Sequence, residues 1–211
     1  MPKEVVSSQT ASIEFDGQRC IHSRNCVLDR PDVFVPNVKG EWIHPEHATD
    51  AELLEIAHNC PSGAIQCKHV DGTSLEKAPV VNLLHVRENG PLAIHAPLTV
   101  SGQEDGFRAT LCRCGAIAHQ PYCDGSHATV QFVATGEPAT QESQALAQRD
   151  GGLKIDPLRN GPLHVSGSLE LVSGTGRTIN RVSDTFLCRC GHSANKPYCD
   201  GSHVKAGFQA D

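Results

Sequence analysis

The chain has 211 residues, of which 38% are hydrophobic and only 4% aromatic, so it can form one to three small domains but no large aromatic core. No stretch approaches the roughly 18 consecutive apolar residues of a membrane helix, and the N-terminal MPKEVVSSQTASIEF lacks the apolar run of a signal peptide. The formal net charge of −6, without a basic block, argues against a nucleic-acid or anionic-membrane partner. We therefore expect a cytoplasmic protein.

The cysteine content is the unusual feature of this composition. Ten cysteines occur in a chain that carries no recognisable export signal. In a reducing compartment, cysteines at this density are more often metal ligands than disulfide partners. The sequence therefore predicts metal sites rather than a disulfide framework.

Residues 1–76 form the first predicted domain. Ile13 and Phe15 alternate with polar residues before an Asp-Gly pair, which indicates a strand followed by a turn. Thr49 and Glu52 have the spacing of a capping box, in which each side chain bonds the other residue's backbone N–H. The apolar stripe that follows predicts a helix ending at Cys60.

Three cysteines of this domain, Cys20, Cys26 and Cys60, follow the pattern C-x5-C…C-P. Together with CVLDRPDVF after the second cysteine and CPSGAI at the third, they resemble the divergent mono-cluster bacterial ferredoxins over residues 11–70. The resemblance implies an iron–sulfur cluster bound by these three residues. The alternative is that they are ordinary buried thiols. We expect a fourth cysteine, Cys67, to be a packed or partly exposed thiol rather than a ligand.

The nuclearity of this cluster depends on position 23. A standard C-x2-C-x2-C run has a cysteine there, whereas this chain has Ser23. Three thiolates suit a [3Fe–4S] cluster, which lacks the fourth iron. A [4Fe–4S] cluster would need Ser23, His22 or a small ligand on that iron. We favour the [3Fe–4S] cluster.

The rest of the chain contains an internal repeat. LCRCGAIAHQPYCDGSH at 111–127 recurs as LCRCGHSANKPYCDGSH at 187–203, an offset of 76, and NGPL at 89–92 recurs at 160–163, an offset of 71. Short apolar stretches at 92–94, 98–100, 163–165 and 169–171 predict strands, with tight turns at the glycines near positions 102, 167 and 174–176. Neither copy has enough apolar residues for its own core, so we expect the two to share one. Residues 136–152 read as a polar linker with a short helix at 140–148.

Each copy carries the pattern C-x-C-x8-C-x3-H. The candidate ligands are Cys112, Cys114, Cys123 and His127 in the first copy, and Cys188, Cys190, Cys199 and His203 in the second. Three thiolates and one imidazole complete either a tetrahedral zinc shell or the terminal ligands of a [2Fe–2S] cluster. Structural zinc usually takes C-x2–4-C pairs, whereas we expect a C-x-C pair to place both sulfurs along an extended edge. The Asp and Ser of each CDGS segment are candidate caps of a short helix that places the third cysteine and the histidine on one face.

The segment CDGSH, preceded by CRC, resembles the CDGSH iron–sulfur domain family. The second copy matches that family's pattern throughout, with Ser193 in its hydroxyl position, whereas the first copy has Ile117 there. The resemblance implies one redox-active [2Fe–2S] cluster in each copy, held by three cysteines and one histidine, and a pairing of the two motifs across a twofold or pseudo-twofold axis.

The histidine ligand sets an expectation for the reduction potential. An oxidised [2Fe–2S] core with three thiolates and a neutral imidazole carries about −1, against about −2 with four thiolates. We expect a potential between the about −400 mV of all-cysteine sites and the about −150 mV at which two-histidine sites begin. A histidine ligand can also gain a proton or leave the metal, so we hypothesise a pH-dependent potential and acid lability centred on His127 and His203.

These observations predict an α+β fold: a small ferredoxin-like domain (1–76), a first β-rich CDGSH domain (77–135), the linker (136–152) and a second CDGSH domain (153–211). We expect the two CDGSH domains to pack as an intrachain pseudo-dimer, which makes the protein a monomer. No nucleophile–base pair, phosphate-binding glycine loop or paired acidic motif stands out, so we expect no enzymatic activity.

Three functions remain after these exclusions. The first is electron transfer between a reductase and an acceptor protein. The second is an iron or cluster carrier that serves an apo iron–sulfur protein, or a redox and pH sensor that uses the labile histidine ligands. The third is a purely structural metal protein, which predicts zinc or redox-inert iron.

Overall fold

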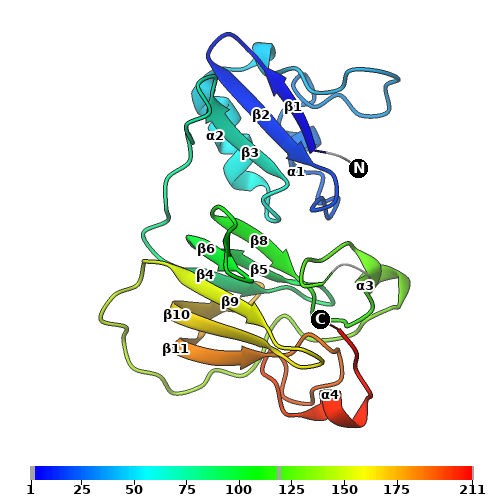
Figure 1. Cartoon of the computed structure of the whole chain (residues 1–211), viewed down its shortest axis with the longest axis vertical. Helices are drawn as coiled ribbons and strands as arrows, with labels where there is room; N and C mark the ends of the chain where they lie inside the picture. Colours follow the sequence, from blue (N-terminus) through cyan, green and yellow to red (C-terminus); the bar gives the residue numbers. More distant parts are fainter. Residues whose placement is uncertain (1–2, 118–119, 211) are drawn as a thin grey trace. The chain divides into compact units, whose positions relative to one another are not determined.

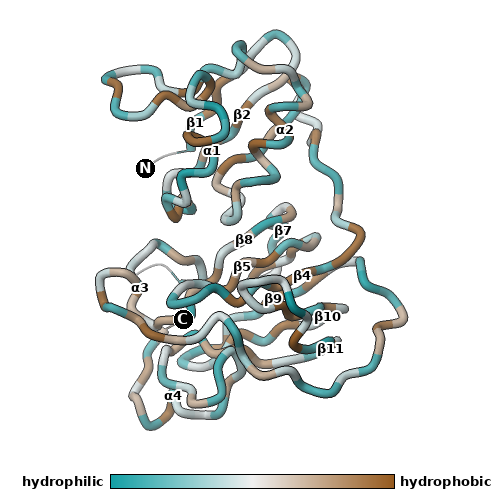
Figure 2. Tube along the Cα trace, turned by 180° about the vertical axis from the view of Figure 1, so that it is seen from behind, coloured by the Kyte–Doolittle hydropathy of each residue, from teal (hydrophilic) through white to brown (hydrophobic). Residues whose placement is uncertain are grey.

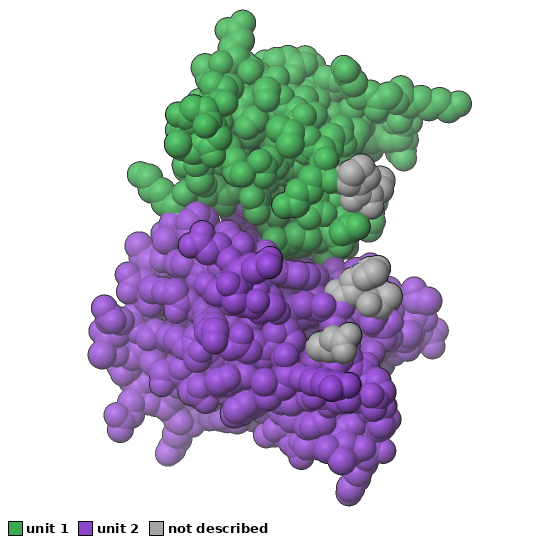
Figure 3. Space-filling view, in the orientation of Figure 1, with its two compact units in different colours: residues 1–77 green, residues 78–211 purple. Residues whose placement is uncertain are grey.

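The computed structural model describes residues 3–117 and 120–210, and it divides the chain between Lys77 and Ala78 into two compact units (Figure 3). The first unit contains β1 (Lys3–Ser7), β2 (Ala11–Asp16), α1 (Asn25–Asp29), a 3-10 turn (Pro45–His47), α2 (Asp50–Asn59) and β3 (Ile65–His69) (Figure 1). The second unit contains β4 (Leu83–Val86), β5 (Leu92–His95), β6 (Leu98–Val100), β7 (Gln103–Glu104), β8 (Arg108–Leu111), α3 (Ser126–Thr129), β9 (Leu153–Pro157), β10 (Leu163–Val172), β11 (Thr178–Leu187) and α4 (Ser202–Lys205).

The first unit is a three-stranded antiparallel sheet, in the order β1-β2-β3, with α2 packed beside β3. The predicted strand at Ile13 and Phe15 is confirmed as β2. The predicted capping box is confirmed as well: the Thr49 hydroxyl accepts from the Glu52 N–H, and the Thr49 N–H donates to the Glu52 carboxylate. Helix α2 ends at Asn59 with Cys60 as its C-cap residue, so the third cysteine of the unit lies in the turn between α2 and β3.

The second unit is one mixed sheet in the order β7-β6-β9-β10-β4-β5-β8, with β11 on the other edge of β10. Two parallel pairings join the repeats, β10 with β4 and β6 with β9. Shifting the pair Leu83–Glu170 by the repeat offset of 71 gives Lys154–Thr99, which is also a pair in the structure. Strand β4 of the first repeat therefore pairs with β10 of the second, and β9 of the second repeat pairs with β6 of the first. The two pairings have equivalent registers.

This exchange of strands produces one core from two short repeats. A single buried cluster joins side chains of both copies, among them Leu84, Ile94 and Leu98 of the first and Ile155 and Leu171 of the second. Figure 2 shows apolar stretches along β4, β5 and β10, with hydrophilic turns between strands. The expectation of a shared core is confirmed.

Two local predictions in this unit are wrong. Gly167 lies inside β10 rather than in a turn, because its positive φ of 115° permits a bulge that shifts the register with β11. The predicted helix at 140–148 is absent from the described residues: the segment has no apolar face to bury and bonds the sheet instead, as when the Gln141 N–H donates to the Ile179 carbonyl oxygen at 2.8 Å.

No helix among residues 3–117 and 120–210 combines the length and the apolar character that crossing a bilayer requires.

The two repeats also meet at their C-x-C segments, and this contact yields a stability prediction. Gly115 (φ +78°) lies so close to the second repeat that an added Cβ would sit 2.5 Å from the Cys190 carbonyl oxygen, whereas Gly102 (φ +79°) has open space around it. Both alanine variants share the cost of a positive φ, and only Gly115→Ala adds a clash with backbone. We expect Gly115→Ala to lower the free energy of unfolding by about 1–3 kcal/mol more than Gly102→Ala, as measured by urea denaturation. Equal losses would contradict this contact.

Candidate metal centres

The structure brings the four predicted ligands of each repeat together as two pairs. In the first repeat, the Sγ atoms of Cys112 and Cys114 lie 3.7 Å apart, and the Cys123 Sγ lies 3.3 Å from Nδ1 of His127. The corresponding distances in the second repeat are 3.7 Å for Cys188–Cys190 and 3.5 Å for Cys199–His203. The repeated sequence therefore produces the same local geometry twice.

These distances match two ligands on one metal ion. With metal–sulfur bonds of about 2.3 Å and metal–nitrogen bonds of about 2.0–2.1 Å, tetrahedral angles place two sulfurs about 3.8 Å apart and a sulfur and a nitrogen about 3.6 Å apart. Among residues 3–117 and 120–210, no three His, Cys, Asp or Glu side chains converge to hold a single ion. Two pairs suit a group with two irons, each taking two protein ligands, better than they suit one zinc ion.

The C-x-C segments differ from the prediction of an extended edge. Strand β8 ends at Leu111, and the chain bends through Cys112 and Cys114. Two hydrogen bonds fix the bend: the Cys112 N–H donates to the Pro121 carbonyl oxygen at 2.8 Å, and the Gly115 N–H donates to the Cys112 Sγ at 3.3 Å. The bend, rather than an extended strand, brings the two sulfurs to metal-sharing distance.

The third cysteine and the histidine are positioned by the turn that opens α3. The Cys123 N–H donates to the Thr110 carbonyl oxygen of β8 at 2.9 Å. The Asp124 carboxylate accepts from the Ser126 N–H at 2.9 Å, but the N-cap itself is Gly125, in the left-handed conformation. The predicted side-chain cap is therefore replaced by an Asp-Gly turn, and Cys123 lies outside the helix that carries His127.

In each repeat, the residue between the first two cysteines in the sequence is a buried arginine. Its structural role could not be predicted from the sequence. Arg113 is 1% exposed, and its guanidinium donates to the backbone carbonyls of Gly90 at 2.9 Å and Thr135 at 3.0 Å. Its cationic group also lies 5.4 Å from the centre of the Phe132 ring. Burial lowers the pKa of Arg113 to about 10, so it keeps its positive charge at neutral pH.

The second repeat uses its arginine in the same way. Arg189 donates to the Gly161 carbonyl oxygen at 2.8 Å and lies 5.4 Å from the centre of the Phe208 ring. The signal in the sequence was the recurrence of NGP ahead of CRC in both copies, because Gly90 and Gly161 belong to those segments. The repeat alone did not predict that the arginine within each C-x-C segment would hydrogen-bond to the NGP turn, which is more than 20 residues away in the sequence.

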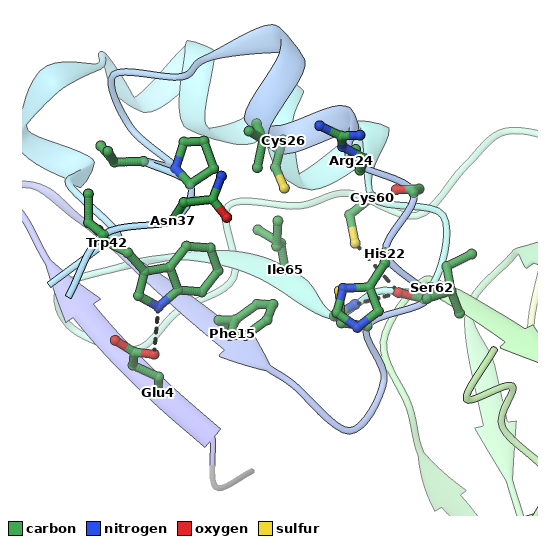
Figure 4. A pocket seen from close by; sticks show the side chains of 18 residues that line it. Glu4, Phe15, His22, Arg24, Cys26, Asn37, Trp42, Cys60, Ser62 and Ile65 are labelled. Atoms are coloured by element: carbon green, nitrogen blue, oxygen red, sulfur yellow. Dashed lines mark hydrogen bonds between the residues drawn. The ribbon is translucent and has the colours of Figure 1, made fainter. Parts of the chain in front are cut away.

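In the first unit, Cys20, Cys26 and Cys60 line one cavity of about 390 Å³. Figure 4 shows the sulfurs of Cys26 and Cys60 pointing into this space. Burial raises the pKa of the Cys26 thiol to about 11 and raises that of Cys20. These thiols are therefore protonated at neutral pH in the absence of metal, and metal binding must release their protons. The three-cysteine set fits an iron–sulfur cluster.

Comparisons with known proteins agree with this arrangement. Residues 89–128 and 160–204 each match the family described as an iron-binding zinc finger of the CDGSH type, and residues 7–69 match the divergent 4Fe-4S mono-cluster family. A stretch of 64 residues, 30% of this chain, is 31% identical to the uncharacterized protein YjdI of Escherichia coli strain K12 and covers 82% of that protein. The YjdI of Escherichia coli O157:H7 matches equally.

The two repeats match the CDGSH iron-binding family. The chain carries two CDGSH domains in tandem, preceded by a divergent 4Fe-4S mono-cluster domain.

One of the differences between the two CDGSH motifs changes the hydrogen bonds of the ligand loop. In the second domain, the Ser193 hydroxyl donates to the Tyr198 carbonyl oxygen at 2.6 Å and accepts from the Asn195 N–H at 3.0 Å. The first domain has Ile117 at this position, which is buried and has no hydroxyl. His119 lies outside the described residues and corresponds in sequence to Asn195, whereas His192, which corresponds to Ala116, is exposed.

This difference predicts unequal sites. Ser193→Ala removes both hydrogen bonds from a buried hydroxyl, at a cost of about 1–3 kcal/mol. We expect iron release from the second CDGSH domain to a chelator to become several-fold faster, as measured by the decay of visible absorbance. Ser183→Ala, on the exposed face of β11, serves as the control and is expected to change nothing. Identical release in both variants would show that Ser193 does not hold the ligand loop.

Cys67 does not share the cavity of the other three cysteines. It lies in β3, is 0% exposed, and its backbone N–H donates to the Glu76 carboxylate at 3.3 Å. Burial raises the pKa of its thiol to about 11. These are the properties of a packed, unreactive thiol.

The contrast between two cysteines tests the ligand set of the first unit. If Cys20, Cys26 and Cys60 hold a [3Fe–4S] cluster, we expect Cys60→Ala to lower the iron content by about three per chain, because it removes one of three ligands. Cys67→Ala removes one buried sulfur atom and is expected to keep all the iron. Iron and sulfide analysis of both variants checks this prediction, which fails if Cys67→Ala loses the iron and Cys60→Ala retains it.

Proposed function

We propose that this chain is an iron–sulfur electron-transfer protein. Each CDGSH domain holds one [2Fe–2S] cluster through three cysteines and one histidine, and the N-terminal domain holds a third cluster through Cys20, Cys26 and Cys60. When bound, such clusters accept and return single electrons. The observation that carries the proposal is the twice-repeated arrangement of ligand pairs at metal-sharing distances.

The contacts between the two CDGSH domains support an intrachain pseudo-dimer. The strands exchange symmetrically, and the Gly115 turn packs against the Cys190 backbone. The Gln120 side chain of the first domain also accepts a hydrogen bond from Arg189 of the second at 2.7 Å. Residues of one ligand motif therefore touch those of the other, which favours electron exchange between the two clusters and a monomeric protein.

The N-terminal domain favours a [3Fe–4S] cluster, since Ser23 replaces the cysteine that a fourth iron would take. The remainder of the proposal follows from the clusters. The partner is a redox protein, either a reductase or an acceptor, and the chain itself converts no substrate.

A second function, cluster or iron delivery to an apo iron–sulfur protein, is favoured by one observation. His127 and His203 are partly exposed on four-residue helices, whereas Cys112 and Cys188 are buried. The histidine side is thus the accessible side of each site, and a neutral imidazole leaves a metal more readily than a thiolate does. A redox or pH sensor would use the same lability.

A reductive titration under anaerobic conditions tests the proposed function. Electron transfer predicts uptake of about three electrons per chain, one for each cluster, and complete reoxidation without loss of iron. A flavoprotein reductase serves as donor and cytochrome c as acceptor. Cluster delivery predicts instead that an apo-ferredoxin becomes loaded while this chain loses iron. A chain that takes up no electrons and loads no apo-ferredoxin contradicts both functions and leaves the structural metal protein.

The histidine ligands give a further prediction. Replacing His127 or His203 by cysteine makes a site more negative by about one charge, which disfavours the reduced state. All-cysteine sites have potentials of about −400 mV, and sites with two histidines begin at about −150 mV. We therefore expect each single replacement to lower the potential of its own cluster by roughly 100 mV. Spectroscopically monitored redox titration measures this shift. Unchanged potentials would exclude the histidines as ligands.

A further inference from the structure

The cavity of the N-terminal domain has two chemically different ends. In Figure 4, Cys26, Cys60 and His22 lie at one end and the Trp42 ring at the other, with Phe15 between. The Cys20 Sγ lies 3.9 Å from Nδ1 of His22 and so belongs to the same end as the other two sulfurs. The wall between them is mostly apolar and is completed by Val27, Val35, Pro36, Val38, Ala64 and Ile65.

The size of the cavity exceeds what the cluster needs. A volume of about 390 Å³ corresponds to about 13 water molecules at about 30 Å³ each. A [3Fe–4S] core has seven atoms and a [4Fe–4S] core has eight. A core held at the sulfur end therefore leaves space at the Trp42 end, and that space lies within the range of small-molecule sites.

The described side chains that line the cavity include no fourth cysteine. Ser23 is exposed. The His22 Nδ1 lies only 3.9 Å from the Cys20 Sγ, and the Ser62 hydroxyl lies 3.6 Å from the Cys60 Sγ. Groups that bind separate irons of a cubane are held apart by the core between them. These two side chains are instead placed to contact a cysteine sulfur that already serves as a ligand.

We propose that this cavity is a binding site for a small apolar thiol, whose sulfur binds the one iron of a [4Fe–4S] form that no cysteine of the chain holds. Thiolate is a soft ligand that suits iron–sulfur clusters, and the walls around Trp42 and Phe15 suit an apolar body. The inference rests on the proposed N-terminal cluster.

The chemistry balances in two steps. The one-electron-reduced [3Fe–4S] cluster, with a core charge of 0, takes up one Fe²⁺ and gives a [4Fe–4S] cluster with a core charge of +2. The thiol then loses its proton to the buffer, and its sulfur forms a bond to the added iron in place of solvent. The first step requires one electron per cluster, for which dithionite is the reductant.

Labelling the added iron tests this site on the full-length protein. Chain that carries natural-abundance iron is reduced with dithionite and given one equivalent of ⁵⁷Fe²⁺, so that the Mössbauer spectrum reports the added iron. Benzenethiol is then titrated. We expect a saturable change in the ⁵⁷Fe spectrum of the unmodified chain. Ser23→Cys completes the C-x2-C-x2-C run and supplies a fourth cysteine, so its labelled iron is expected not to respond.

A pair of variants tests the apolar end. Val38 lines the cavity and is 46% exposed, whereas Val70 is 58% exposed and lies elsewhere in the same unit. We expect Val38→Phe to keep the uptake of ⁵⁷Fe²⁺ and to weaken benzenethiol binding at least tenfold. Val70→Phe is expected to change neither.

The outcomes separate this inference from the proposed function. If ⁵⁷Fe²⁺ enters the cluster but benzenethiol leaves its spectrum unchanged, the thiol site is wrong and the cluster stands. A response in Ser23→Cys equal to that of the unmodified chain also overturns the thiol site. If the chain has no N-terminal cluster and takes up no ⁵⁷Fe²⁺, both the third cluster and the thiol site are wrong.

Discussion

The parallel pairings of β4 with β10 and of β6 with β9 are the constraint on which the tandem sites depend. Neither CDGSH domain has enough apolar side chains to close a core, so each completes its sheet with a strand from the other. Because the exchange is symmetric, it also fixes the relation between the two C-x-C turns. The contact of Gly115 with the Cys190 backbone is a consequence of this shared sheet.

In each CDGSH domain, the four candidate ligands are positioned by backbone hydrogen bonds and by one buried arginine. The first cysteine directly follows strand β8 in the first repeat and β11 in the second. A bend in the chain then places the second sulfur 3.7 Å from the first, and an Asp-Gly turn positions the third cysteine and the histidine. Arg113 and Arg189 hold the bend against the NGP turn. The same side chain that fixes the bend would also place a positive charge near the proposed cluster.

Much of this arrangement could be predicted from the sequence, because repeats and ligand spacings are local signals. The capping box of α2, the strand at Ile13 and the shared core followed from pattern and from the shortage of apolar residues. The bend at the C-x-C segment could not be predicted, since it depends on a hydrogen bond to Pro121, nine residues past Cys112. The prediction of a helix at 140–148 failed because the backbone of this segment forms hydrogen bonds with the sheet instead. Helix propensity, which depends on local sequence, does not include such long-range contacts. The role of Arg113 depends on carbonyls more than 20 residues away.

Metal and sulfide analysis of anaerobically purified protein, with EPR spectra before and after reduction, tests the central claim most directly. Two [2Fe–2S] clusters and one [3Fe–4S] cluster predict about seven irons per chain, with an EPR signal of the [3Fe–4S] cluster in the oxidised state. About four irons, silent until reduced, would confine the clusters to the CDGSH domains. Zinc without acid-labile sulfide would contradict the account.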